Sequence, residues 1–264
     1  MRVHVVSDVH GNVDALARAG ESADALVVLG DLLDLVDYQD FSRGILGAVF
    51  GPDAVARFAE LRSSGAPGDA GAYARSLWAG LDDAQTVLTE AVRAQYRRLF
   101  AALSAPTYAT PGNVDVPGLW PEFARDGVHV LDGGVAEIGG RRFGFVGGGL
   151  IPDGLVRPPR RRDPWVPYLR TGQEFGAAVD RLTAVDVLCS HVPPAVPELV
   201  YDVRARRAEF GSPHLLSLIH RQRPGHALFG HVHQPLARRA RVGYTECVNV
   251  GYFRSTGTPH VLQW

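Results

Sequence analysis

The sequence contains little cysteine and no lysine. Its 264 residues include two cysteines, Cys189 and Cys247, and two thiols cannot build the disulfide framework of a small exported protein. All 27 basic residues are arginine, a bias from which we derive no function. The N-terminal residues also lack the apolar region of a signal peptide. Together these absences predict a cytoplasmic protein.

Long apolar runs and an excess of one charge are also missing. No stretch approaches the roughly 18 apolar residues that span a bilayer, so no membrane span is expected. The 27 basic and 28 acidic residues leave a formal net charge of -1, which does not indicate a nucleic-acid partner. Nothing in the sequence indicates an oligomeric state.

Short β-branched runs alternate with helical patterns from the N-terminus onward. Residues 2–7 and 25–30 are predicted strands, and residues 12–20 between them have helical spacing, which is a β–α–β beginning. Further strands are predicted at 106–112, within 128–147, and at 185–191, 226–233, 238–251 and 260–264. Because no repeat or low-complexity linker divides the chain, we predict a single domain over residues 1–264.

Two segments interrupt this alternation. Residues 41–104 have helical spacing, and a break at 63–72 predicts at least two helices. We predict that this segment is a helical insertion, forming a cap or side lobe within the domain. Residues 148–171 are rich in proline, glycine and arginine and are predicted to form a loop. Arg157 and Arg160 to Arg162 in this loop are interpreted as a solvated run, with a phosphate clamp as the alternative.

Side chains that bind metals follow five of the predicted strands. In chain order they are Asp8 and His10, Asp31, Asn113, His191, and His231 with His233. Ligands of open α/β sheets bind beyond the carboxyl ends of the strands, so we expect these side chains at one edge. In Asp-x-His and His-x-His, alternate residues point to the same side of an extended segment. Carboxylate, imidazole and amide donors without cysteine suit manganese, iron, zinc, cobalt or nickel.

Five short segments carry a resemblance to a known family. They are SDVHGN (7–12), GDLLD (30–34), GNVD (112–115), SH (190–191) and GHVH (230–233). In this order they resemble the calcineurin-like metallophosphoesterases, and most of all the small bacterial metal-dependent phosphodiesterases. The resemblance extends from Asp8 to VNVG (248–251). It implies an α/β fold, a four-layer αββα sandwich of two mixed β-sheets, with a dinuclear metal site at its edge.

The resemblance also implies which side chains hold the metals. One ion would be held by Asp8, His10, Asp31 and His233, and the other by Asp31, Asn113, His191 and His231. Asp31 would bridge two divalent or trivalent ions, for which manganese is preferred over iron, zinc, nickel or cobalt. Asp31, Asn113 and His191 would act in catalysis through the metals and a bridging hydroxide that attacks phosphorus in line.

The implied activity is the hydrolysis of phosphoric esters. We expect a phosphodiesterase that acts on a small phosphate ester or a nucleotide. The alternatives are a phosphomonoesterase, such as a protein or nucleotide phosphatase, and a non-catalytic binding scaffold on the same fold. A scaffold would be marked by lost ligands, and all seven are present.

At one position the residue type differs from that of many relatives. Between Asn113 and Asp115, which matches an acidic residue of the family, many relatives carry a histidine that can protonate the leaving group. Here the position is Val114, which has no proton to donate. Some bacterial phosphodiesterases of the superfamily also lack this histidine. We expect Asn12 to cap the first helix rather than touch substrate. Asp34 is expected either to support Asp31 or to begin a helix.

Overall fold

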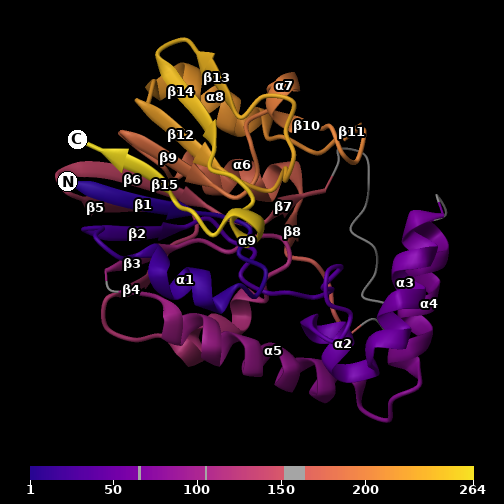
Figure 1. Ribbon diagram of the computed structural model, residues 1–264. Helices are drawn as coiled ribbons and strands as arrows, with labels where there is room; N and C mark the ends of the chain where they lie inside the picture. Colours follow the sequence, from indigo (N-terminus) through magenta and orange to yellow (C-terminus); the bar gives the residue numbers. More distant parts are fainter. Residues whose placement is uncertain (65–66, 105, 152–163) are drawn as a thin grey trace.

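Two β-sheets packed face to face form the centre of the protein (Figure 1). The computed structural model describes residues 1–64, 67–104, 106–151 and 164–264. The first sheet has the order β15-β1-β2-β3-β4, with β1 Arg2–Val6, β2 Ala25–Val28, β3 Thr107–Ala109, β4 Val128–Val130 and β15 His260–Gln263. The second has the order β13-β14-β12-β9-β6-β5, with β5 Gly134–Ile138, β6 Arg141–Val146, β9 Val187–Ser190, β12 His226–Phe229, β13 Arg239–Val242 and β14 Thr245–Asn249.

Both sheets are mixed. Strands β1 to β4 run parallel to one another, and β15 pairs antiparallel with β1. In the second sheet, β6, β9, β12 and β14 are parallel, whereas β5 and β13 are antiparallel edge strands. The parallel central strands of both sheets therefore bring their carboxyl ends to one side of the sandwich, where ligands of such sheets bind.

The alternation of side chains along each strand produces three apolar layers. Val3 and Val5 of β1 pack with Phe143 and Phe145 of β6 between the two sheets. Val6, on the other face of β1, packs against helices outside the first sheet. Side chains of successive strand residues point to opposite faces of the sheet, so both faces of each sheet are buried.

Helices cover the outer face of each sheet. On the first sheet lie α1 Val13–Ala19 and α5 Ala84–Ala102, and on the second lie α6 Gly172–Asp180 and α8 Pro213–Gln222. The α5 residues Leu88, Val92, Tyr96 and Leu99 form one buried stripe, as their helical spacing predicts. The predicted four-layer αββα sandwich of two mixed sheets is thus confirmed.

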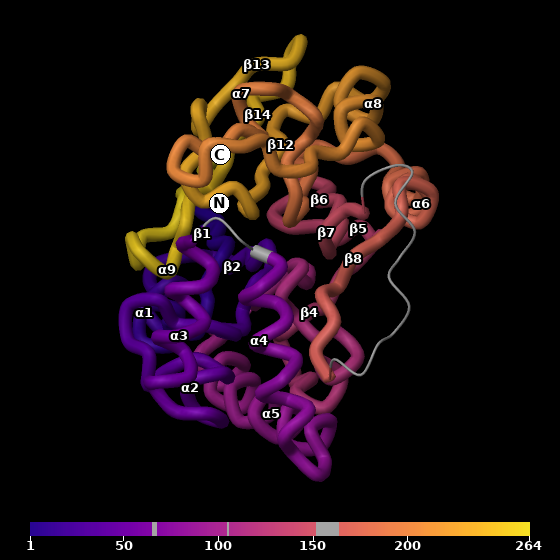
Figure 2. Tube along the Cα trace, turned by 90° about the vertical axis from the view of Figure 1, so that its right-hand side faces the viewer, coloured from indigo at the N-terminus to yellow at the C-terminus, as the bar shows by residue number. Residues whose placement is uncertain are grey.

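The predicted insertion at 41–104 contains four helices, among them α5. The others are α2 Gly44–Phe50, α3 Pro52–Ser63 and α4 Pro67–Ala79. Helix α5 is a layer of the sandwich, because it packs beside α1 on the first sheet. Helices α3 and α4 stand beyond the carboxyl ends of the strands, in front of the sandwich in Figure 2. We call α3 and α4 the lobe, and its role as a cap stays a prediction.

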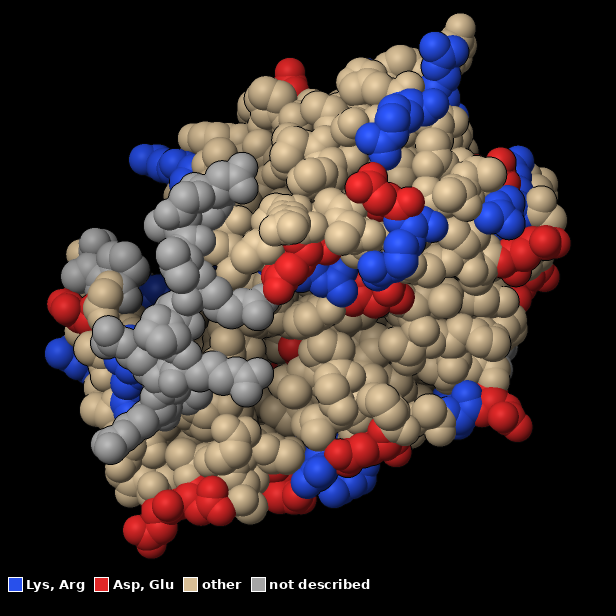
Figure 3. Space-filling model, turned by 180° about the vertical axis from the view of Figure 1, so that it is seen from behind, with Lys and Arg blue, Asp and Glu red and all other residues tan. Residues whose placement is uncertain are grey.

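Residues 148–171 are only partly described. They contain two short strands, β7 Gly149–Leu150 and β8 Leu169–Arg170, which pair in parallel. The arginines proposed as a phosphate clamp, Arg157 and Arg160 to Arg162, lie outside the described residues. Among the helices described, none has the length and apolar character required to cross a membrane. Arginines and acidic residues are interspersed over the described part of the face that Figure 3 shows.

Candidate metal centre

All seven predicted ligands follow the carboxyl end of a parallel strand. Asp8 and His10 follow β1, Asp31 follows β2, and Asn113 follows β3 in the first sheet; in the second sheet His191 follows β9, and His231 and His233 follow β12. Since the two sheets pack face to face, the turns after these strands meet at one edge. The structure brings the seven side chains together there, and the pocket over them extends to the lobe.

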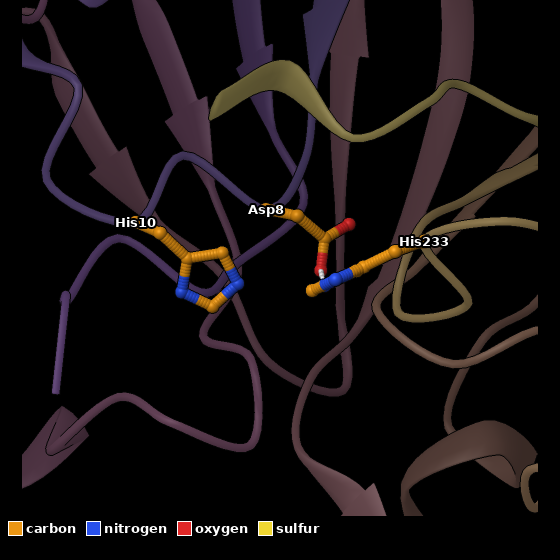
Figure 4. Close-up of side chains that lie close together, drawn as sticks. All are labelled: Asp8, His10 and His233. Atoms are coloured by element: carbon orange, nitrogen blue, oxygen red, sulfur yellow. Dashed lines mark ion pairs between the residues drawn. The ribbon is translucent and has the colours of Figure 1, made fainter. Parts of the chain in front are cut away.

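Asp8, His10 and His233 form the first group of ligand atoms. One atom from each lies within 4.8 Å of the others, and Figure 4 shows the three side chains close together. His233 Nε2 lies 3.3 Å from Asp8 Oδ1. Among the described residues, neither Asp8 Oδ1 nor His10 Nε2, both buried, has a hydrogen-bond partner. Buried polar atoms without partners are costly, so this pair of atoms indicates a place for a cation.

Asp8, Asp31 and His191 form the second group, again within 4.8 Å. Asp31 Oδ2 lies 3.5 Å from His191 Nε2 and 3.8 Å from His10 Nε2. Neighbouring ligands of one ion, each about 2.1 Å from it, are roughly 3.0–3.4 Å apart, so these spacings are close to those of a metal site. Asp8 belongs to both groups, and Asp31 lies between histidines assigned to different ions. The bridging role of Asp31 stays a prediction.

Asn113 lies between two imidazoles. Its Oδ1 is 2.9 Å from His191 Nε2 and 2.9 Å from His231 Nδ1. His191 Nδ1 lies 2.8 Å from the Leu29 carbonyl, which only accepts hydrogen bonds, so Nδ1 carries a proton. In the neutral imidazole, Nε2 then presents a lone pair to an amide oxygen. The lone pairs of His191 Nε2 and of the Asn113 oxygen repel each other. A cation beside these atoms, either a proton or a metal ion, removes this repulsion.

Backbone groups fix the direction of the side chains. His10 Nδ1 lies 3.0 Å from the Leu33 carbonyl, which leaves Nε2 turned to the site. One oxygen of each carboxylate accepts a backbone N–H: Asp8 Oδ2 from His231 and Asp31 Oδ1 from Val114. The other oxygen of each faces histidines. Such outer contacts set the tautomer and orientation of metal ligands.

Burial controls the charge of several of these groups. It lowers the pKa of His10 to about 4 and that of His231 to about 3, which keeps both imidazoles neutral and able to ligate. Burial also raises the pKa of Asp31 to about 7, and the carboxylates of Asp8 and Asp115 act in the same direction. A bound cation favours the ionised carboxylate, so metal binding at this group competes with a proton.

Four of the predicted ligands have an unusual backbone. Asp8, His10, Asp31 and His231 have φ angles of 57°, 40°, 52° and 67°, in the left-handed region that non-glycine residues rarely adopt. Each costs on the order of 1 kcal/mol, and such residues cluster at functional sites. Half of the eight non-glycine residues described with positive φ are predicted ligands.

Glycines before the ligands allow the turns to approach one another. A Cβ on Gly112 would lie 2.2 Å from Asp31 Oδ1, and one on Gly230 would lie 2.3 Å from Asp8 Oδ2. No side chain fits at such distances, so the motifs require glycine before Asn113 and His231 for close packing.

Asp115 ties two ligand turns together. Buried at 1% exposure, it accepts the backbone N–H groups of Leu32 and Leu33 after β2 and of Gly112 after β3. The Tyr96 hydroxyl donates to it from α5 at 3.3 Å. The acidic residue of the GNVD segment therefore holds the turn of Asp31 against that of Asn113, and does not itself face the histidines.

Two residues beside the ligands carry no motif in the sequence. The Tyr252 ring stacks on His233 at 4.0 Å and meets the edge of His10 at 5.8 Å. Arg254 donates to the His10 carbonyl and pairs with Asp34 at 2.9 Å. Tyr252 follows β14 and is the N-cap of the short helix α9 Phe253–Thr256, which contains Arg254; no periodicity marks either residue. Asp34 therefore supports the site through this arginine rather than beginning a helix. Asn12 caps α1 as expected, because its side chain accepts the N–H of Ala15.

A pocket of about 910 Å³ opens over the site. At one end it is lined by His10, Asn113, Val114 and His233, and at the other by the lobe. A pocket of about 1090 Å³ between α5 and α6 contains none of the predicted ligands. We therefore regard the smaller pocket as the one that serves the site.

The comparisons with known proteins agree with this architecture. The model of the calcineurin-like phosphoesterase family matches residues 66–235, more than half of the chain. One crystal structure is similar at a TM-score of 0.59 and 17% identity, covering 99% of this chain and 98% of the other. The crystal structure of the protein TT1561 of Thermus thermophilus is similar at 0.56 and 14%, with the same coverage. These two likenesses support the fold alone, and no curated protein sequence matches significantly.

The fold, with two groups of metal-binding side chains at one edge, defines a metal-dependent phosphoester hydrolase. The chain belongs to the calcineurin-like phosphoesterase family, whose enzymes use a dinuclear metal centre. The matched range contains the predicted ligands from Asn113 to His233, whereas those from Asp8 to Asp31 precede it.

Proposed function

We propose that the protein is a phosphodiesterase whose two metal ions are held by the seven predicted side chains. The observation that carries the proposal is the pair of ligand groups that share Asp8, with Asn113 Oδ1 at 2.9 Å from two imidazoles beside them. The donor set fits manganese, which we prefer, and also iron, zinc, nickel or cobalt. When bound, two such ions activate water as a nucleophile near neutral pH and neutralise charge on the phosphoryl oxygens.

The protein's own groups orient this chemistry. Asp31 is fixed by the N–H of Val114, so its second oxygen faces His191. His191, fully buried, is fixed by the Leu29 carbonyl. We propose that Asp31, Asn113 and His191 act in catalysis by holding the ions in place beside the pocket. Ligands fixed in this way need little rearrangement when charge develops in the transition state.

The charges at the metal-binding end of the pocket favour a diester over a monoester. A phosphomonoester carries nearly two negative charges at neutral pH and a diester only one. Arg254 lines the pocket near the ligands, but its guanidinium already pairs with Asp34 at 2.9 Å and Asp37 at 2.5 Å. It therefore has little charge left for a second phosphoryl oxyanion. The proposed substrate is a small phosphate ester or a nucleotide, and the cytoplasmic location stays a prediction.

A hydrolysis screen tests the proposal. The protein would be reconstituted with each candidate metal and assayed with bis(p-nitrophenyl) phosphate and p-nitrophenyl phosphate. We expect kcat/KM to be at least about tenfold higher for the diester, and Asp31→Asn to lose nearly all activity. Asp126→Asn, which changes an exposed carboxylate, should match the wild type. A higher value for the monoester would support the phosphomonoesterase, and a protein that binds no metal and hydrolyses neither ester would support the scaffold.

A further inference from the structure

The pocket over the ligands extends to the lobe. Its lining includes Phe58 and Arg62 of α3 and Arg75 and Trp78 of α4, together with His10 and other residues at the metal-binding end. Figures 1 and 2 show the two helices beyond the strand ends, on the side of the ligand turns. A substrate with its phosphorus at the metal-binding end therefore meets the lobe with the rest of the molecule.

The apolar part of this wall is well packed. Trp78 is 5% exposed and Phe58 is 9% exposed. The Trp78 ring meets Phe50 of α2 edge to face, with centroids 4.7 Å apart. Aromatic pairs of this kind pack favourably, so the lobe presents a supported surface to the pocket. This part of the wall fits the carbon skeleton of an organic ester.

Two guanidinium groups at the lobe end have no acidic partner. The side chains of Arg62 and Arg75 are exposed, and within the described ranges no ion pair involves either. The guanidinium of Arg62 lies over the Tyr38 ring at 5.8 Å. By contrast, Arg57 of the same helix pairs with Glu60 at 3.1 Å. Arg57 and Arg62 are five residues apart, so they point about 140° apart around the helix axis, and Arg57 does not line the pocket.

The carboxylates that line the pocket are already engaged. Asp34 pairs with Arg254, and Asp202 accepts three backbone N–H groups, those of Arg204, Ala205 and Gln234. Arg204 itself is exposed and also lines the pocket. Among the described residues that line the pocket, the uncompensated charge is therefore positive, and an anionic group at the outer end would find guanidinium donors.

We propose that Arg62 and Arg75 bind a second anionic group of the substrate, a phosphate or a carboxylate, while the scissile phosphoester lies beside the metal ligands. This inference rests on the proposed function and deepens it, because it names a bis-anionic phosphoester as the substrate class. A sphere with the volume of this pocket, about 910 Å³, would be about 12 Å across, so we chose a chain of about six carbons to join the two ends.

Non-hydrolysable probes test this inference apart from turnover. Three phosphonates share a six-carbon chain and differ at its far end: hexylphosphonate, 6-phosphonohexanoate and hexane-1,6-bisphosphonate, each used with a monomethyl ester on one phosphonate, so that the group beside the metal ligands carries one charge like a phosphodiester. Their equilibrium binding to the manganese-loaded protein would be measured by calorimetry for the wild type, Arg62→Ala, Arg75→Ala and the double variant. Arg57→Ala is the matched control.

The wild type should bind at least one probe with a second anion about 5- to 20-fold more tightly than hexylphosphonate. Each single substitution should weaken the binding of that probe about 3- to 5-fold, as expected for the loss of an exposed charge pair. The double variant should bind it no more tightly than hexylphosphonate. High salt should reduce the advantage. Arg57→Ala should keep it, and all variants should bind hexylphosphonate equally. The carboxylate and bisphosphonate probes distinguish the two kinds of second anion.

Two outcomes separate failure of the inference from failure of the proposed function. If hexylphosphonate binds and aryl phosphoesters are hydrolysed, but neither bis-anionic probe binds more tightly, the second anion site is refuted and the phosphoesterase stands. If a bis-anionic probe binds more tightly and the double variant keeps the advantage, the assignment to Arg62 and Arg75 is wrong. If no phosphonate binds and no ester is hydrolysed with any metal, the proposed function fails and this inference fails with it.

Discussion

Replacing Asp31 by asparagine should stabilise the metal-free protein and abolish its stabilisation by metal. Asp31 is 3% exposed. One of its oxygens accepts the N–H of Val114 at 2.8 Å, and the other faces His191 and His10. Burial first, and then the carboxylates of Asp8 and Asp115, raise the pKa of Asp31 from 3.8 to about 7. Asparagine keeps the shape and the acceptor but removes the charge.

The sign of the effect follows from the direction of the pKa shift. A carboxyl group whose pKa is raised on folding stabilises the fold at low pH, and this contribution is lost as the pH rises from about 4 through about 7. A rise from 3.8 to about 7 corresponds to on the order of 4 kcal/mol. The metal-free Asp31→Asn protein should therefore be about 2 to 4 kcal/mol more stable than the wild type at about pH 8, and similar to it at about pH 4.

Metal should reverse this order. A ligand present at 100 times its Kd stabilises a folded protein by about 2.7 kcal/mol. Excess manganese should do this for the wild type, and Asp31→Asn should lose most of the gain because a charged ligand is missing. Urea unfolding followed by tryptophan fluorescence, with chelator and with manganese, measures both effects, and Asp126→Asn is the control. Two results together would refute the reasoning: an Asp31→Asn protein less stable than the wild type in chelator at about pH 8, and equal stabilisation of both proteins by manganese.

Four further outcomes are expected. The apparent affinity for manganese should fall up to tenfold per pH unit below about 7, where Asp31 holds a proton; calorimetry at several pH values checks this, and an affinity independent of pH would contradict it. Asp115→Ala should cost about 3 to 5 kcal/mol in urea unfolding, because it leaves buried N–H groups of two ligand turns without an acceptor, whereas Glu137→Gln on the surface should change little. Val114→His should accelerate alkyl diesters more than aryl diesters, by up to about 10²-fold, since a general acid helps basic leaving groups most; wild-type rates that do not depend on leaving-group pKa would show that another group supplies the proton. Replacing residues of α2 to α4 by a short linker should change the substrate profile more than the metal content, and an unchanged profile would mean that the lobe does not shape the pocket.

The sheets, and the meeting of the seven candidate ligands at one edge, were predictable because both follow local rules; that these side chains bind metal stays a prediction. Short apolar runs mark β1, β2, β9 and β12, and each carries its candidate ligand one to four residues past the strand. Parallel strands place such residues at one edge regardless of the loops between them. The helical stripe of α5 was predictable from its period. The division of 41–104 between a sandwich layer and a lobe was not predictable, because all four helices share the same period and differ only in what they contact.

Residues that act through long-range contacts could not be predicted. Arg254 supports His10 across 244 positions of the sequence, and Tyr252 stacks on His233. Neither stands in a motif, and both reach the site because the chain after β14 returns over the first ligand turn. Two hydrogen bonds of Asp115 are of the same kind, since those from the Leu32 and Leu33 N–H groups join the turn after β3 to the turn after β2. A single sequence contains the residue but not the partner that defines its role.

The backbone of the ligand turns explains why short motifs identify this site better than periodicity does. Asp8, His10, Asp31 and His231 leave the strand conformation for the left-handed region, where helical and strand periods no longer apply. Aspartate, asparagine and histidine tolerate this region better than most residues, and the same three types provide hard and borderline metal donors. One choice of residue therefore satisfies both the turn and the ion. The glycines beside them satisfy the remaining requirement, close approach of the turns, so four of the five motifs place a glycine next to a candidate ligand after a strand; SH (190–191) is the exception. A substitution that keeps the donor but adds a side chain at Gly112 or Gly230 should disturb the centre as much as loss of a ligand does.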